Sequence, residues 1–281
     1  MSKKFILNAD DFGMSQAFNR AVLKGYQKGI LTSASICANG EAFENAVSEI
    51  IPQCPNLSVG VHLNIIEGKS LTDVALLTDN DGNFNNGYLA LIMKSYNKKF
   101  LAQVEQEFRA QIETVISKTK VDHIDSHVHT HAIPNIFKIV VKLAKEYNIP
   151  YIRTQFEHPY MIPSIKKHLK PAYYVNLIKI ALLNTFTIIN KPLVKVNDLK
   201  TNDYLIGVGY TGMMSDRTIA YGLRSLKKKD CLAEALIHPC DYDDSKIDHH
   251  TMEFELTQNE DLRVFIGQIG FELSNHTNAI L

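Results

Sequence analysis

Short apolar runs alternate along the chain with longer segments in which apolar residues recur every three or four positions. The runs have the length and β-branched content of buried strands, and the longer segments have the period of helices that bury one face. Phe18, Val22 and Tyr26 show this helical spacing, with Ser15 placed to cap the helix start and Gly29 its end. Strands are expected at 4–10, 31–39, 57–65, 121–129, 149–153, 204–210 and 233–239, and helices at 16–28, 41–51, 101–115, 134–143, 216–227 and from about 258.

The repeated order of strand and helix predicts a mostly parallel sheet with helices packed around it. About seven strands suit a (β/α) barrel-like α/β fold better than two separate domains, and no linker divides residues 1–281. The polar stretch 72–87, which contains "DNDGNFNNG", is expected to form a long loop. At about 160–205 the pattern changes to an apolar helical insertion.

That insertion contains "AYYVNLIKIALLNTFTII", residues 172–189, which is nearly long enough to cross a bilayer. Asn176, Lys179 and Asn184 lie inside it, and a charge near the middle of a span costs about 2.5–3.5 kcal/mol. A buried or interface-forming helix is therefore favoured over a membrane span, and no membrane partner is expected. An exposed apolar stripe in 160–205 would support a homo-oligomer.

The composition argues against several other classes of protein. Lys and Arg together number 30, as do Asp and Glu, so no net charge attracts the chain to nucleic acid. The N-terminal apolar run is too short for a signal peptide. The four cysteines form no Cys-x-x-Cys unit, which makes a thiolate zinc site or a disulfide framework improbable. A reduced, cytoplasmic protein is the expectation.

Chemically reactive residues stand where four of the expected strands end. Asp10 and Asp11 end the first strand, His62 ends the third, a histidine-rich stretch ends the next, and His238 ends the last. In parallel α/β barrels the active site lies at the carboxyl ends of the strands. These distant residues are therefore expected to meet in one site.

The adjacent carboxylates Asp10 and Asp11 would point to opposite faces of an ideal strand, but a turn at its end lets both reach one site. One can then bind a metal ion while its neighbour acts as a base. Alternatively, either one organises the turn and the helix start, as Asp often does. His62 is a core residue or a ligand, and Asn64 on the same face makes that face costly to bury without a purpose.

The stretch "HIDSHVHTH" (123–131) holds four histidines and one aspartate. Two-residue alternation places the polar members on one face of a strand: His123, Asp125, His127, His129 and His131. A barrel strand supplies a site in this way while its apolar face packs against helices. A metal ion is an efficient partner for such a face, and Asp125 would orient a ligating imidazole. His129 and His131 are expected at the rim, where a solvated loop explains them equally well.

Two further residues are candidates for the same site. Pro239 restricts His238 to extended backbone geometry, and a fixed histidine beside a metal suits general acid catalysis at neutral pH. His238 could equally be a structural residue that closes the strand. Arg153 could hold a carboxylate in place or form a surface ion pair.

The ordered set "NADDFG" (8–13), "GVHLN" (60–64), "HIDSHVHTH" (123–131) and "IHP" (237–239) resembles the YdjC-like carbohydrate deacetylase family, which includes chitooligosaccharide deacetylases. "LTSASICANG" (31–40) is similar to that family's second strand. The resemblance implies a (β/α)-barrel-like fold and one divalent metal ion bound by Asp11, His62 and His127. It also implies Asp10 as the catalytic base and His238 as an acid or a substrate contact.

Under this interpretation, the residues expected to support the site or bind substrate are Asp125, His129, Arg153 and Asn64. The chain departs from the family pattern at Cys240, where a small residue is more usual, and in its apolar insertion. Both departures bear on the substrate rather than on the chemistry.

The resemblance implies removal of acetyl groups from an N-acetylated oligosaccharide. The metal ion would polarise the acetamide carbonyl and activate water, Asp10 would take the water proton, and His238 would protonate the departing amine. The family implies magnesium, while the histidines would equally suit zinc.

Two other classes stay open. Another metal-dependent barrel hydrolase, of the amidohydrolase or phosphoesterase type, would commonly carry His-x-His on its first strand, where this chain has Asp-Asp. A metal- or sugar-binding regulator without turnover would use the same residues.

Overall fold

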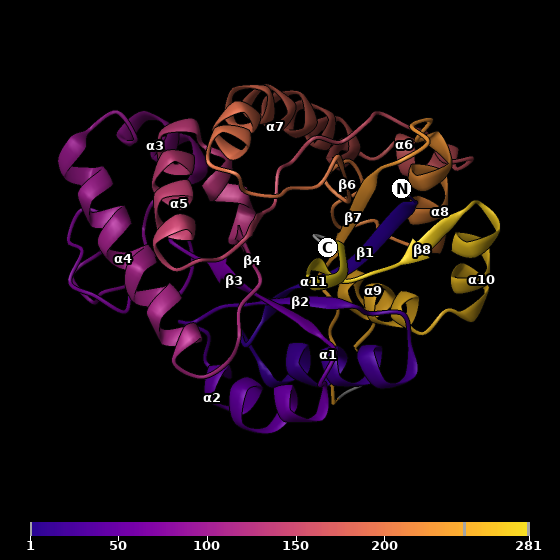
Figure 1. Cartoon of the computed structure of the whole chain (residues 1–281), viewed down its shortest axis with the longest axis horizontal. Helices are drawn as coiled ribbons and strands as arrows, with labels where there is room; N and C mark the ends of the chain where they lie inside the picture. The colour runs from indigo at the N-terminus through magenta and orange to yellow at the C-terminus, as the bar shows by residue number, and fades with distance from the viewer. Residues whose placement is uncertain (1, 244–245, 280–281) are drawn as a thin grey trace.

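The computed structural model describes residues 2–243 and 246–279 of the chain (Figure 1). Eight strands form one curled sheet with helices around it, and the seven in its continuous path follow the order β5-β4-β3-β2-β1-β7-β6. β8 pairs with β1, and every pairing between these strands is parallel. This arrangement confirms the predicted barrel-like α/β fold.

The strands are β1 (Lys3–Phe12), β2 (Ser33–Ile36), β3 (Ser58–Leu63), β4 (His123–Ser126), β5 (Tyr151–Ile152), β6 (Tyr204–Ile206), β7 (Leu232–Ile237) and β8 (Phe271–Leu273). The helices are α1 (Gln16–Lys28), α2 (Phe43–Asn45), α3 (Tyr88–Lys94), α4 (Lys98–Ile116), α5 (Pro134–Glu146), α6 (Ile165–His168), α7 (Pro171–Val196), α8 (Asp216–Ser225), α9 (His249–Thr257), α10 (Glu260–Gln268) and α11 (His276–Ala279). The sequence pattern missed the strand β8 and the helices α3, α9 and α11, which are short.

Local signals set several of these boundaries. The Ser15 side chain accepts a hydrogen bond from the Phe18 amide and caps α1, and Gly29 ends that helix, as predicted. The helix expected at 41–51 is instead the single turn α2, followed by a π-helical turn Ala46–Ile50 and a 3-10 turn. Pro52 in that last turn lacks the amide hydrogen that a continuing α-helix would use.

Side chains along β1 alternate between the hydrophobic core and a polar interior of the curled sheet. Phe5 and Leu7 pack into the hydrophobic core between sheet and helices, while Asn8 and Asp10 take part in polar contacts inside the sheet. Gly60 of β3 faces the ring of His123, and a Cβ at this glycine would lie 2.2 Å from that ring. The interior of the sheet is therefore filled by polar side chains for which small residues leave room.

Buried Glu157 gives a pH-dependent stability that can be measured. It accepts hydrogen bonds from the amides of Val208 and Gly209, but burial dominates and raises the pKa of its carboxyl to about 7. Since the folded-state pKa lies above the ordinary glutamate value of 4.5, this group contributes stability at low pH that is lost as pH rises through about 7. In denaturant titrations across this window, Glu157→Gln should lose less stability with rising pH than the parent chain; parallel curves would contradict the prediction.

Candidate active site

The first strand ends in a distorted turn that brings two neighbouring carboxylates to one place. The register between β1 and β2 shifts between Ala9 and Phe12, and Asp11 has a positive φ of 63°. A non-glycine residue in this conformation stores about 1–3 kcal/mol of strain. The distortion breaks the two-residue alternation, so that Asp10 lines a cavity while Asp11 contacts two histidines beside it.

His62 on β3 is oriented by its neighbour on β4. Parallel pairing sets His62 beside Asp125, whose Oδ1 lies 2.7 Å from His62 Nδ1. The other ring nitrogen, Nε2, lies 3.3 Å from Asp11 Oδ1. Both side chains are buried, and this arrangement is how a carboxylate orients a metal-ligating imidazole. The predicted supporting position of Asp125 follows from the strand register.

The histidine-rich stretch does not continue as a strand, and the predicted alternation is wrong beyond Asp125. β4 ends at Ser126, and a 3-10 turn from His127 to Ala132 follows, in which Val128 and His129 have positive φ angles of 52° and 57°. The chain turns inward at His127, whose Nδ1 lies 2.8 Å from Asp11 Oδ1. His127 therefore reaches the predicted site, but from a turn.

Asp11, His62 and His127 each offer one ligand atom, and these three atoms lie within 4.8 Å of one another. Glu67, which the sequence analysis missed, has Oε2 3.4 Å from His127 Nε2. Burial alone would raise the pKa of Asp11, but hydrogen bonds from His127 and His62 hold it well below its usual range. One carboxylate oxygen and two imidazole nitrogens form a donor set that fits a divalent ion.

Arg153 binds three carboxylates inside the barrel, so the alternative of a surface ion pair is wrong. Its guanidinium contacts both oxygens of Asp10 at 2.8 Å, Asp125 Oδ2 at 2.7 Å and Glu234 Oε1 at 2.6 Å. The side chain is fully buried. Glu234 was not predicted, although a charged residue within the apolar strand 233–239 is a signal for it.

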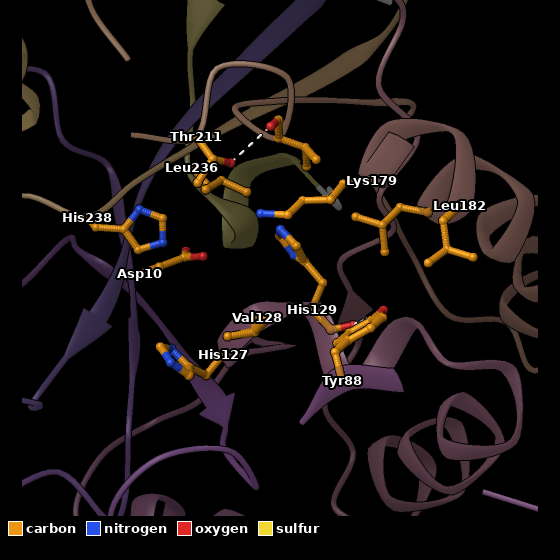
Figure 2. A pocket seen from close by; sticks show the side chains of 12 residues that line it. Asp10, Tyr88, His127, Val128, His129, Lys179, Leu182, Thr211, Leu236 and His238 are labelled. Carbon is orange, nitrogen blue, oxygen red and sulfur yellow. Dashed lines mark hydrogen bonds between the residues drawn. The ribbon is translucent and has the colours of Figure 1, made fainter. Parts of the chain in front are cut away.

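His238 follows β7 and lies across the cavity from His127 (Figure 2). Its Nδ1 is 3.5 Å from Oε2 of Glu253, a residue of α9 that no sequence pattern singled out. Burial would lower the pKa of His238, but Glu253 and the aspartates at the end of β1 raise it to about 9. These carboxylates thus favour the protonated form of His238.

These groups border a cavity of about 300 Å³ at the carboxyl ends of the strands. Figure 2 shows the Asp10 and His238 side chains next to each other, with His127 and His129 among the other side chains that line the cavity. The lining residues are Asp10, Tyr88, His127, Val128, His129, Lys179, Leu182, Leu183, Val208, Thr211, Leu236 and His238. The cavity thus joins a polar, titratable end to apolar walls and is within the size range of small-molecule sites.

Other predicted residues lie elsewhere. The Asn64 side chain accepts hydrogen bonds from the amides of Ile66 and Glu67 and so shapes the loop that carries Glu67, rather than lining the cavity. His129 lines the cavity, as a rim residue should. His131 is fully buried, contrary to the rim prediction, and bonds to Ser126 Oγ and the Arg153 carbonyl.

Asp125→Asn tests the orientation of His62. The amide can no longer offer two charged oxygens to His62 and Arg153, so we expect divalent-ion affinity to fall about 10–100-fold by titration calorimetry. Asp203→Asn is the control, because Asp203 also binds a cationic side chain, Lys228, but belongs to none of the candidate ligand groups in the described part of the chain. Equal losses of affinity in both variants would refute this role.

The fold and the site together define a class: barrel-like parallel α/β proteins with a carboxylate–imidazole centre at the carboxyl ends of the strands. The chain belongs to the family described as YdjC-like protein, whose sequence profile matches residues 4–268. A crystal structure from Enterococcus faecalis V583, of a candidate cellobiose-phosphate cleavage protein, is similar with a TM-score of 0.76 at 22% identity, covering 99% of both chains. At that identity the likeness concerns the fold.

Curated relatives include proteins named carbohydrate deacetylase. That of Brevibacillus brevis is 42% identical over 149 residues, which are 52% of this chain and 58% of the relative. That of Clostridium beijerinckii is 39% identical over 149 residues, with the same shares. The aligned part is thus little more than half of each protein.

Proposed function

We propose that the protein is a metal-dependent hydrolase that removes acetyl groups from N-acetylated sugars of the chitooligosaccharide type. The observation that carries the proposal is the convergence of Asp11, His62 and His127 beside the cavity that holds Asp10 and His238. The names of the curated relatives support the same substrate class.

Asp11, His62 and His127 would hold the divalent ion. Nδ1 of His62 is hydrogen-bonded to Asp125, so its other ring nitrogen, Nε2, points toward Asp11. Magnesium is the ion that the family resemblance implies, while two imidazoles favour zinc. When bound, the ion would polarise the acetamide carbonyl and lower the pKa of water.

Asp10 is placed to accept the proton of the attacking water. Its carboxylate lines the cavity, and Arg153 holds both of its oxygens, which fixes the direction of the side chain. His238 lines the same cavity, and neighbouring carboxylates raise the pKa of its imidazole against the effect of burial. In this proposal Asp10 is the base, and His238 is the acid that donates a proton to the departing amine.

The test is acetate release from N-acetylated chitobiose by the full chain, with magnesium, zinc or no added ion after chelation. We expect release that depends on the ion and is lost in His238→Ala, with ion binding retained. Sugar binding without acetate release under any ion would favour a regulator. Phosphate release from phosphomonoesters instead would favour a phosphoesterase.

A further inference from the structure

The long helix α7 (Pro171–Val196) packs one face against the protein through both apolar and polar side chains, and it also leaves apolar side chains exposed on the opposite face. Its inward face carries three amide or hydroxyl side chains bonded to the rest of the protein. Asn176 donates to the carbonyl of Thr211, Asn190 donates to that of Ala132, and Thr187 accepts from the Gln155 amide. These asparagines and threonine are buried beside apolar side chains of the same face, so polar and apolar contacts together hold the helix in place.

The face of α7 that points away from the protein is also largely apolar. Exposed residues recur at spacings of three and four, as one helical stripe requires: Tyr174, Ile178, Ala181, Thr185, Ile188, Pro192 and Val196. Ile178 and Ile188 are 71% and 68% exposed, and Val175 beside the stripe is 51% exposed. A helix facing water normally shows the opposite arrangement. We call this surface the outer stripe.

The charged residues within the segment that carries the outer stripe are all lysines. Between residues 158 and 197 the sequence has six lysines and no aspartate or glutamate, although the whole chain is neutral: Lys166, Lys167, Lys170, Lys179, Lys191 and Lys195. Three of them precede the helix and two stand in its last turns, so they flank the apolar stripe at both ends. Lysines at the ends of an apolar helical face are suited to phosphate headgroups.

The charge pattern distinguishes between two occupants of the stripe. A second copy of the chain would bring its own lysines against these, without an acid in the segment to pair with them. An anionic lipid surface offers both the apolar layer and the negative charge. Of the residues that argue against a membrane span in the sequence, Asn176 and Asn184 donate hydrogen bonds to carbonyls of the protein and Lys179 lines the cavity, so none of them lies on the outer stripe.

We propose that α7 docks the protein on the surface of an anionic phospholipid membrane, lying in the interface with its outer stripe against the lipid. By length and composition α7 could also cross a bilayer, but a third of its most apolar window is buried against the protein, which fits a helix lying on the surface. The same helix supplies Lys179, Leu182 and Leu183 to the candidate active site. Docking therefore brings the cavity close to the membrane, as Figure 1 shows for α7 along one edge of the molecule.

Flotation of the full chain with vesicles tests the proposal and needs no enzymatic activity, so its outcome is separate from that of the proposed function. We expect binding to vesicles that contain phosphatidylglycerol, weak binding to phosphatidylcholine alone, and loss of binding as salt rises. Lys166→Gln, Lys170→Gln and Lys195→Gln should each weaken binding roughly five-fold.

Two identical substitutions provide a matched pair. Val175→Glu on α7 and Val264→Glu on α10 change residues that are 51% and 52% exposed. Only Val175→Glu should reduce flotation, while both keep the same unfolding temperature. Absence of flotation with either vesicle, or equal losses in the two variants, would overturn the proposal. So would a dimer in solution that Val175→Glu dissociates while vesicles stay unbound, because the stripe would then join two copies.

Discussion

Replacing His127 with alanine is expected to abolish divalent-ion binding and acetate release together. His127 belongs to the three-residue ligand group with Asp11 and His62, and its Nδ1 lies beside the Asp11 carboxylate. Without His127, the ion would keep only the imidazole of His62 and the carboxylate of Asp11. His127 lies at the first position of a turn, partly exposed, so its removal should cost little folding stability. Titration calorimetry with zinc and magnesium, beside the acetate assay, measures both losses.

His131→Ala is the control from the same turn. His131 is fully buried, and its ring bonds to Ser126 and to the Arg153 carbonyl, so this variant should unfold at a lower temperature. Its ring lies outside the three-atom cluster, and ion binding should persist below the unfolding temperature. Equal loss of ion affinity in the two variants would mean that the turn, rather than His127 itself, holds the ion.

The sequence predicted which residues meet in the site, because the active site of a parallel α/β barrel lies at the carboxyl ends of its strands and the strand ends are visible in the hydrophobic pattern. Asp10, His62 and His238 each stand at the end of an apolar run, and the fold brings them to one edge. The position of Asp125 beside His62 follows from strand register in the same way. These are local patterns combined with one topological rule.

The backbone path after Asp125 could not be predicted, because it depends on φ angles that non-glycine residues rarely adopt. Two consecutive residues, Val128 and His129, take positive φ angles, which are rare for a β-branched side chain. Asp11 does the same at the end of β1. Both sites of strain lie beside the candidate metal centre, where the surrounding structure must stabilise them.

The inward asparagines of α7 show a second limit of sequence analysis. Polar residues in an apolar segment suggest an interrupted span, but which face they occupy depends on the packing partner. Asn190 reaches a carbonyl 58 positions away along the chain, in the turn that carries His127. Only the three-dimensional structure shows that these asparagines of α7 face the protein while apolar side chains of the same helix face outward.

Replacing Arg153 with methionine is expected to destabilise the fold by about 3–5 kcal/mol, because it leaves buried carboxylates without their counter-charge. The guanidinium is fully buried and contacts Asp10, Asp125 and Glu234, each of which would lose its cationic partner in the low-dielectric interior. Chemical unfolding measures the loss. Arg153→Lys should recover only part of it, because one ammonium cannot match a planar fork that binds three carboxylates.

The double variant Arg153→Met with Glu234→Gln decides whether unpaired charge is the cause. Neutralising Glu234 removes one of the three buried negative charges, so the double variant should be more stable than Arg153→Met alone. Glu234→Gln in the parent chain should instead be destabilising, because it weakens the hydrogen bonds that the Glu234 carboxylate accepts from Arg153 and Tyr151. If lost packing were the cause, the second substitution would add to the damage. Asp10 keeps its Asn8 contact in either variant but is no longer fixed by Arg153, so acetate release should stay low even where stability returns. Stability restored without activity would separate the two roles of Arg153, holding the barrel interior together and orienting Asp10.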